Sequence, residues 1–507
     1  MSSYVIHCKV VSLLFNEKLN VKQLLSCIMN QRLIRAFWPF LMAFLFLVSI
    51  TEAQEIIIKP NADTELKVTT NTYSNLVLYQ ELSSVRAIKV RTEEGIFSEL
   101  LIPGFSSNEL IGYPKLPVNR KLIEVPASAD PLVEVTYSHK TTIFLEDEGI
   151  AHYLMPVQPP APKDGTVPEF VINDAAYHTD KLYGQELVTV DMLGYLRGVR
   201  LARVNIAPVK YNPVRGILEI YEDIEVNIRF EGADVAQTMI EKEKNNIPYY
   251  RSLGRQILNY KSIQSPNRDT ITKYPVKYVI VSDRMFETQL QPLIEWKTRK
   301  GFTVIEAYTD EPSVGNTTSS IKSYLQGLYD AGTPDDPAPS FVLFVGDVQQ
   351  IPAWNGSSGS HVTDLYYCEY TGDVFPEVYY GRMSAQNSTQ LQPQIDKTLQ
   401  YEQYTMPDPS FLNEVVMVAG MDGTHGHDWG NGQINYGTEN YFNVAHGITS
   451  HTYLYPESGS HSADIIQNIS DGVSYGNYTA HCNQNGWGDP SFTISDIPGL
   501  QNQDEYC

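Results

Sequence analysis

The chain of 507 residues contains two regions with different patterns of apolar and polar positions. From 54 to 232, short segments alternate between apolar and polar side chains, and turns rich in Pro and Gly separate them. In one segment Ile224, Val226 and Ile228 alternate with polar neighbours, so one face of a strand is apolar and the other polar. This β-rich region is predicted to be an antiparallel β-sandwich.

The pattern changes in the second region, 273–507. Near-continuous apolar runs are typical of parallel strands that are buried on both faces, and helix-spaced apolar positions follow several of them. Strands are predicted at 276–283, 302–308, 340–347, 377–382 and 414–420, and helices at 286–300, 319–332 and 388–404. This alternation predicts a three-layer α/β domain with a mostly parallel sheet.

The two regions are joined by a polar segment, 233–272, in which acidic and basic side chains are mixed. Such a composition favours an exposed connector and a site of proteolytic cleavage.

The N-terminal segment, 1–53, has the features of an export signal. Arg32 and Arg35 precede an apolar run at 37–50, and small residues including Ala53 follow it. The run is shorter than the roughly 20 residues of a membrane-spanning helix. The sequence therefore predicts an upstream extension and a signal peptide cleaved after Ala53. A secreted or cell-surface protein with no stable membrane span would result.

Composition excludes several other classes of function. The net charge of −22 argues against nucleic-acid binding, which requires a basic surface. Five cysteines are too few and too scattered for a disulfide scaffold. The glycine-containing loops lack the lysine of a phosphate-binding loop, which disfavours nucleotide binding.

Two polar loops carry candidate catalytic residues. Asp422 lies in a Gly-rich loop at 421–437, directly after the strand predicted at 414–420, and His481 follows a short β-like run. The carboxyl ends of neighbouring parallel strands meet at one edge of a sheet, so the two can form a base and its orienting carboxylate. Alternatively, the histidine is solvated and the carboxylate caps a turn, as Asp347 can do after its own strand.

A metallohydrolase is a further alternative. The Gly-rich loop also holds His425, His427 and Asp428, and His446 follows, so ligand types that zinc accepts are present. However, the two loop histidines lack the helical i,i+4 spacing of a zinc-peptidase motif, and no EF-hand spacing suggests calcium.

Several segments together resemble the gingipain family of cysteine peptidases. They are VKYVIVSD, FVLFVGDVQQIPA, VTDLYY, EVYYGRMSA, QIDKTLQYE and NYTAHCNQNGWGDPSF, in this order between about 274 and 507. The β-rich region resembles the family's propeptide more weakly. The resemblance implies a caspase-like α/β fold and thiol proteolysis of protein or peptide substrates. It implies no required cofactor, and a structural calcium ion is compatible with it.

The resemblance also implies roles for individual residues. His481 lies in Tyr-Thr-Ala-His-Cys, which matches the family's Tyr-Thr-Gly-His-Gly stretch around the catalytic histidine. Asp422 occupies the place of the acidic partner. Gln433 stands where the arginine-specific members carry an acid in the substrate pocket, so a preference for Arg or Lys does not transfer.

The family's nucleophilic cysteine follows a hydrophobic strand further beyond the histidine. We therefore expect the sequence given, which ends at Cys507, to stop before its nucleophile. Cys482 is expected on the other side of the strand from His481, and Cys368 is expected to be a packed thiol. The alternative function is a non-catalytic secreted binding or adhesion module with a caspase-like domain.

Overall fold

The computed structural model describes residues 53–60, 62–159, 169–250, 252–263, 276–357, 361–423 and 426–505. The chain divides into two units, Met1–Gln54 and Glu55–Cys507, and everything below concerns the second unit. The predicted signal peptide, His425 and Cys507 lie outside the described residues. Within the described residues, no helix has the length and apolar character needed to cross a membrane.

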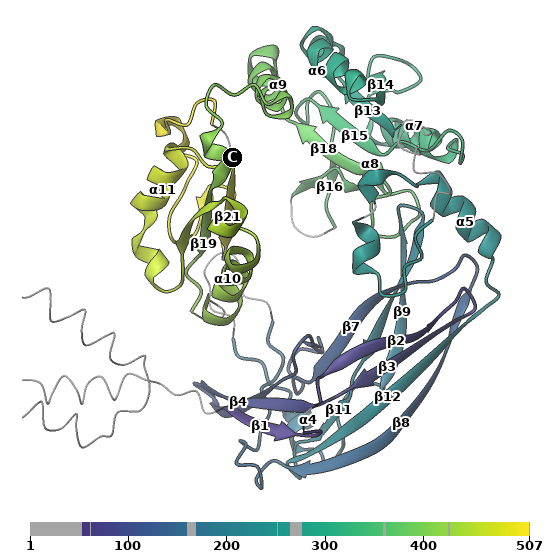
Figure 1. Cartoon of the computed structure of the whole chain (residues 1–507), viewed down its shortest axis with the longest axis vertical. Helices are drawn as coiled ribbons and strands as arrows, with labels where there is room; N and C mark the ends of the chain where they lie inside the picture. Colours follow the sequence, from purple (N-terminus) through teal and green to yellow (C-terminus); the bar gives the residue numbers. More distant parts are fainter. Residues whose placement is uncertain are drawn as a thin grey trace, which may run out of the picture. The chain divides into compact units, whose positions relative to one another are not determined.

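The N-terminal region consists of antiparallel strands (Figure 1). One sheet has the order β11-β12-β3-β2, with β8 also paired to β12; a second has the order β6-β7-β10-β9; a third has the order β1-β4-β5. The elements are β1 (Ala53–Ile57), β2 (Glu65–Asn71), β3 (Asn75–Glu81), β4 (Ser84–Thr92), β5 (Gly95–Leu101), β6 (Ser106–Ser107), β7 (Pro117–Glu124), β8 (Asp130–Phe144), α4 (Asp174–His178), β9 (Val188–Leu196), β10 (Val199–Ile206), β11 (Val209–Asn212) and β12 (Ile217–Glu231).

The alternating pattern of β12 explains how these sheets pack. Ile224, Val226 and Ile228 are fully buried, whereas the residues between them are partly or fully exposed. They share a core with Leu78 of β3 and with Val204 of β10, so the apolar faces of the two larger sheets meet. The pairings within these two sheets are antiparallel, which confirms the prediction of antiparallel strands.

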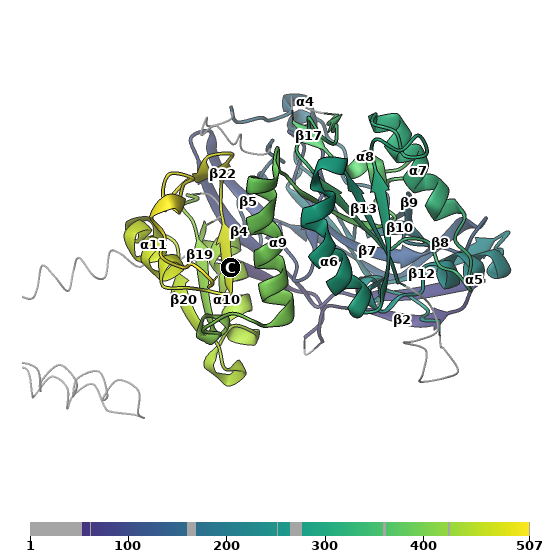
Figure 2. The same cartoon turned by 90° about the horizontal axis from the view of Figure 1, so that it is seen from above.

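The second region begins with a four-stranded parallel sheet of order β14-β13-β15-β18. Val279 and Val281 of β13 pack with α7, whereas Ile280 between them packs with α6 and α9 on the opposite face. Figure 2 shows α6 and α9 side by side on that face. The elements are β13 (Val276–Ser282), α6 (Glu287–Arg299), β14 (Phe302–Tyr308), α7 (Thr318–Asp330), β15 (Phe341–Val345), β16 (Trp354–Asn355), β17 (Val362–Thr363), α8 (Leu365–Cys368), β18 (Tyr379–Met383) and α9 (Ser388–Gln403).

The remaining parallel strands form a sheet of their own, with the order β20-β19-β21. Val416 and Val418 of β19 pack against α11, and Met417 between them packs against Ile434 of α10. The elements are β19 (Glu414–Ala419), α10 (Asn431–Asn440), β20 (Thr449–Tyr453), α11 (Ser462–Ser470) and β21 (Tyr475–Thr479). The prediction of mostly parallel strands is therefore confirmed, but in the described residues these strands form two sheets and not one. A strand buried on both faces is recognisable from its apolar sequence, but the sequence does not show which other strands it pairs with.

The described part of 233–272, predicted as an exposed connector, contains a helix and mixes exposed with buried residues. Val235–Lys244 form helix α5, which Asp234 caps by accepting a hydrogen bond from the backbone N–H of Gln237. The segment that follows packs against β7, where Asn259 is 1% exposed. The polar side chains of this segment look solvent-exposed in the sequence because their partners, such as Glu124, lie more than a hundred residues earlier in the chain.

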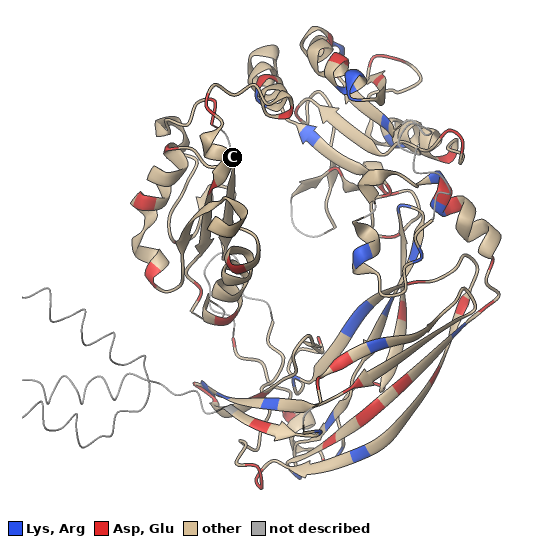
Figure 3. Cartoon of the chain, in the orientation of Figure 1, with Lys and Arg blue, Asp and Glu red and all other residues tan. Residues whose placement is uncertain are grey.

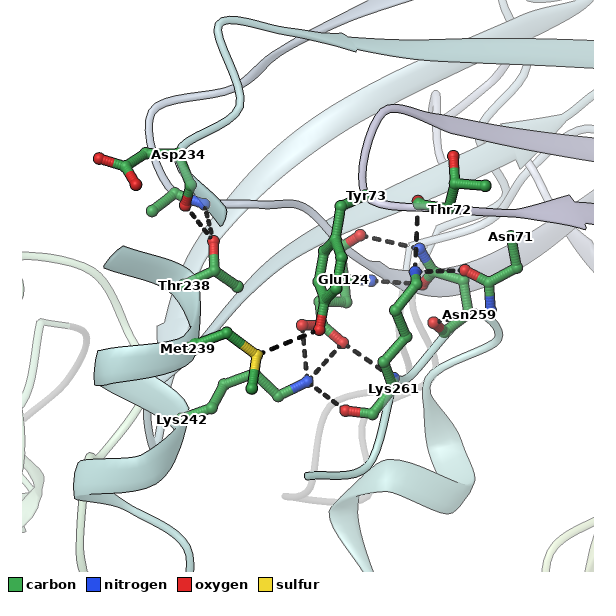
Figure 4. Close-up of polar contacts among 11 residues, drawn as sticks. Asn71, Thr72, Tyr73, Glu124, Asp234, Thr238, Met239, Lys242, Asn259 and Lys261 are labelled. Carbon is green, nitrogen blue, oxygen red and sulfur yellow. Dashed lines mark hydrogen bonds and ion pairs between the residues drawn. The ribbon is translucent and has the colours of Figure 1, made fainter. Parts of the chain in front are cut away.

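A buried ion pair fixes this segment to the β-rich region (Figure 4). The Lys242 ammonium donates to both carboxylate oxygens of Glu124, at 2.7 and 2.9 Å, and to the Lys261 carbonyl oxygen at 2.6 Å. The side chains of Lys242 and Glu124 are 2% and 3% exposed. Asn259 completes the cluster by exchanging two hydrogen bonds with the Glu124 backbone. Burial lowers the pKa of Lys242, and the carboxylate opposes this effect.

The tip of the β9–β10 hairpin contacts the second region. The Tyr195 backbone N–H donates to Asp373 at 2.7 Å, and the Arg197 guanidinium lies 3.7 Å from the centre of the Tyr379 ring. Gly194 has a φ of +134°, and a Cβ there would overlap the Asp373 carboxylate. The close approach therefore requires glycine.

Unlike the part with the β20-β19-β21 sheet, which carries acidic side chains but no Lys or Arg, the β-rich region and the part with the β14-β13-β15-β18 sheet carry interspersed acidic and basic side chains (Figure 3). Arg284 illustrates this arrangement, since it pairs with Asp310 and Glu311 from the turn after β14. More than half of the net charge of −22 comes from 398–507, which contain 13 Asp or Glu and no Lys or Arg.

Candidate active site

The structure places Asp422 and His481 beside each other at the carboxyl end of the second parallel sheet. Thr479, the last residue of β21, is in register with Ala419, the last residue of β19. Asp422 and His481 follow these two strand ends, and His481 Nε2 lies 3.4 Å from Asp422 Oδ2. The side chains are 45% and 19% exposed, so the imidazole can be reached from solvent. The pair has the composition of a general base with an orienting carboxylate.

Gly420 allows the two strand ends to approach closely. Its backbone N–H donates to the Thr479 carbonyl oxygen at 3.1 Å. A Cβ at this position would lie 2.5 Å from the Tyr478 ring and 2.6 Å from the Ala480 side chain. The absence of a side chain at 420 therefore brings the Asp422 segment against the segment that carries His481.

The segment after His481 folds back on β21. The short strands β22 (Cys482–Asn483) and β23 (Gly486–Trp487) form an antiparallel hairpin. Gly488 donates its backbone N–H to the His481 carbonyl oxygen at 2.9 Å. The ring of Trp487 stacks on Tyr478, with 4.5 Å between ring centres. The carbonyl oxygen of His481 is thus tied to the end of the hairpin, and the hairpin is packed on β21.

The prediction that 421–437 is a loop is wrong for its second half. A π-helical turn spans Gly426–Gly430, and α10 follows it. Ile434 of α10 is fully buried against β19, and Asn431 exchanges two hydrogen bonds with the backbone of Tyr455. Buried contact with β19 offsets the low helix propensity of the glycines in this segment.

The position proposed for substrate recognition, Gln433, lies on α10 next to the end of β21. The Thr479 hydroxyl donates to Gln433 Oε1 at 3.3 Å. The residue therefore lies near the segment that carries His481, and it contributes a neutral amide there.

The zinc alternative gains no support from the described residues, which contain no group of three or more His, Cys, Asp or Glu side chains that could hold a metal ion. His427 packs edge-on against the Tyr455 ring, with 4.8 Å between ring centres. His446 is exposed and shares a hydrogen bond with Asn443. His425, the third histidine considered, lies outside the described residues.

Asp347 serves as a turn cap after β15. Its carboxylate accepts from the Val348 backbone N–H and from Gln386, each at 2.8 Å. The Gln386 bond, with the Val348 bond second, lowers the pKa of Asp347. The capping interpretation therefore accounts for this strand-end carboxylate.

The two described cysteines differ in their surroundings. Cys368 ends helix α8 and is fully buried in the core, and this burial raises the pKa of its thiol well above the ordinary value. The prediction of a packed thiol is confirmed. Cys482 is exposed in β22, next to His481 in sequence.

A second histidine–carboxylate pair lies at the opposite end of the same sheet. His451 of β20 lies 2.9 Å from Glu414, the first residue of β19. This pair lies toward the amino-terminal ends of the strands and provides a natural control for the pair at the carboxyl end.

The fold and site define a class of protein: a β-rich region precedes an α/β region with a histidine–carboxylate pair at a sheet edge. The model of Peptidase family C25 matches residues 271–507, and the model of its propeptide matches residues 63–265. The chain belongs to this family, the gingipain family of cysteine peptidases, and it contains both a propeptide region and a peptidase region.

Among particular relatives, Lys-gingipain W83 of Porphyromonas gingivalis is 37% identical over 459 residues, covering 90% of this chain and 26% of the relative. Gingipain R2 of the same species is 26% identical over 437 residues, covering 82% of this chain and 55% of the relative. A solved structure concerned with zymogenic latency of gingipain K is 35% identical, covers 36% of this chain and all of its own, and has a TM-score of 0.34. The chain thus spans about a quarter of the length of the Lys-gingipains it matches.

Proposed function

We propose that the full-length protein is the precursor of a secreted cysteine endopeptidase in which His481 and Asp422 activate a thiol. The observation that carries this proposal is the 3.4 Å approach of the two side chains at the carboxyl end of the sheet, in a chain of a cysteine peptidase family. The two parallel sheets, each with helices on both faces, support a caspase-like peptidase fold.

The chemistry follows from the arrangement of the pair. His481 takes the proton of the attacking thiol, and the thiolate sulfur forms a bond to the scissile carbonyl carbon. The imidazolium then protonates the leaving amine, and water activated by the same imidazole releases the acyl group from the thioester. Asp422 contacts Nε2, so it orients the ring and stabilises the imidazolium while Nδ1 serves the thiol. These steps use side chains and water and need no cofactor.

We further propose that neither described cysteine is the nucleophile, which would come from a residue outside the described part of the chain. The complete burial of Cys368 keeps its thiol from a peptide substrate. Cys482 is paired with Trp487 in the β22–β23 hairpin, and the Trp487 ring stacks on Tyr478, so the hairpin fixes the position of Cys482.

For substrate recognition, we propose that Gln433 contacts the side chain on the amino-terminal side of the scissile bond. The site lies beside Thr479, close to His481 along β21. Because the amide is neutral, it supplies no fixed charge for an arginine or lysine side chain.

For regulation, we propose that the β-rich region keeps the peptidase latent until the segment after 263 is cut. The contacts of Tyr195 with Asp373 and of Arg197 with Tyr379 hold the β-rich region on the peptidase region. The related gingipain K structure is itself described in terms of zymogenic latency. Export through the N-terminal signal would place the precursor outside the cell.

The alternative, a non-catalytic secreted binding module, is favoured by one observation: the described residues hold no accessible thiol other than Cys482. In that case the full-length protein would neither cleave peptides nor be labelled at a reactive thiol.

The experiment compares activity of the full-length, processed protein and its variants on fluorogenic peptides. We expect His481→Ala to lower kcat by about 10²-fold or more, and Asp422→Asn to lower it by a smaller factor. The matched controls are His451→Ala and Glu414→Gln, which alter the pair at the other end of the sheet and should stay within about twofold of the unmodified protein. Undiminished activity of His481→Ala would overturn the proposal.

A further inference from the structure

The hydroxyl of Tyr478 lies at a junction that connects the two halves of the His481–Asp422 pair. It is 3.0 Å from the His481 carbonyl oxygen and 3.1 Å from the Asp489 carbonyl oxygen. It also accepts a hydrogen bond from the Asp489 backbone N–H at 3.3 Å. One side chain therefore contacts the backbone on both sides of the β22–β23 hairpin.

The same junction extends to the segment that carries Asp422. The Met421 backbone N–H donates to the Asp489 carbonyl oxygen at 2.7 Å. Asp422 is the next residue in the chain, so its backbone is tied to Asp489, which is tied to Tyr478 and thus to His481. A continuous set of polar contacts links the two members of the pair through their main chains, in addition to the contact between their side chains.

The ring of Tyr478 is fixed by packing, which makes the hydroxyl a rigid support. It stacks on Trp487, with planes inclined by 10°, and packs against the core formed by β19 and α11. The ring also lies close to Gly420, where a Cβ would come within 2.5 Å of it. A side chain confined in this way loses little further conformational entropy when its hydroxyl forms hydrogen bonds.

We propose that Tyr478 is a positioning residue whose hydroxyl holds the backbones of His481 and Asp422 in the register that the pair requires. The inference rests on the proposed function, in which His481 is the base. It predicts that loss of the hydroxyl alters the chemical step and leaves substrate binding intact, because Tyr478 contacts the base through its backbone. Misplacement of a reacting group by about 1 Å can cost about 10²-fold in rate.

The test uses Tyr478→Phe in the full-length, processed protein. This change keeps the stack on Trp487 and removes only the hydroxyl. We expect kcat to fall about 10-fold or more while KM stays within about twofold. The alkylation rate of the reactive thiol by iodoacetamide should fall in parallel, since it depends on the same base. A proportional rise in KM with constant kcat would overturn the inference.

The matched control is Tyr453→Phe. Tyr453 packs on the same core, and its hydroxyl accepts a hydrogen bond from Asn468 at 2.6 Å. Its loss should have a similar effect on stability, and it should leave kcat and the alkylation rate unchanged. An equal loss of kcat in both variants would show that Tyr478 only supports the fold.

A double variant separates this inference from the proposed function. If Tyr478 acts through His481, Tyr478→Phe should cause no further loss of thiol alkylation in a His481→Ala background. An additive loss would refute the positioning role while leaving His481 as the base. If Tyr478→Phe fails to fold, 4-aminophenylalanine at 478 restores a donor and should rescue kcat relative to 4-methylphenylalanine. Equal activity of these two proteins would overturn the inference.

Discussion

The buried Lys242–Glu124 pair allows a quantitative prediction about how the β-rich region is held together. In Lys242→Met the ammonium and its three hydrogen bonds are lost, and the Glu124 carboxylate stays buried without a cation. Breaking a buried pair by removing one partner costs about 3–5 kcal/mol. Because the ammonium makes three hydrogen bonds, two of them to a carboxylate, we expect a cost in the upper half of this range of about 3–5 kcal/mol.

Hydrogen–deuterium exchange measures this cost where it arises. In peptides covering β7 and α5, the free energy of local opening should be several kcal/mol lower in Lys242→Met than in the unmodified protein, so their amides should exchange faster. Trypsin should also cleave after Lys261 more rapidly, because its carbonyl oxygen loses the Lys242 donor. Peptides from the β20-β19-β21 sheet should exchange as before and provide an internal reference.

Two further variants test the reasoning. Lys140→Met removes one partner of the exposed Lys140–Glu219 pair in the same region and should change exchange far less, because solvent screens an exposed pair. The double variant Lys242→Met/Glu124→Leu replaces both charges by apolar groups and should regain most of the lost stability. If Lys242→Met changes exchange no more than Lys140→Met, the ion pair does not fix the segment, and the reasoning is wrong.

Three other predictions follow from contacts described above or from burial. Burial raises the pKa of Glu377 from 4.5 to about 7, so between pH 4.5 and 7 the folded state binds more protons than the unfolded state. The free energy of unfolding should therefore fall as the pH rises through this interval. Thermal unfolding at several pH values should show this decrease, and Glu377→Gln should abolish it. Gln433→Glu should increase kcat/KM for peptides with Arg or Lys before the scissile bond about 10-fold relative to neutral peptides, and equal ratios in both proteins would exclude Gln433 from that pocket. Gly194→Ala should speed dissociation of the β-rich region after cleavage, as measured by size-exclusion chromatography over time, whereas Gly95→Ala, at a positive φ with open space around it, should not.

The sequence predicted the fold wherever one segment determines its own pattern. The alternation in β12 and the apolar run of β13 each reflect how many faces of a strand are buried, and both strands occur as expected. The buried part of the connector is not marked in the sequence because the partner of Lys242 lies 118 residues earlier, and helix α10 is not marked because Ile434 gains its burial from β19. Contacts of this kind depend on tertiary structure, which local composition does not encode.

The candidate site was predictable to the same extent. His481 and Asp422 are recognisable by residue type at the ends of strands, and the structure brings their side chains together. The role of Tyr478 is not visible in the sequence, since its hydroxyl contacts backbone carbonyl groups that no sequence pattern marks. Its place three positions before the histidine was the available signal.

The segment between α5 and the second region has a consequence for how activation would end. Tyr250 donates its hydroxyl to the Ser340 carbonyl oxygen in the peptidase region, while Asn259 and Lys261 are bound to Glu124 in the β-rich region. A single cut beyond Ile263 would therefore leave two fragments associated without a covalent link. Liberation of the enzyme would then be governed by dilution into the surroundings, or by a second cut that destroys the departing partner.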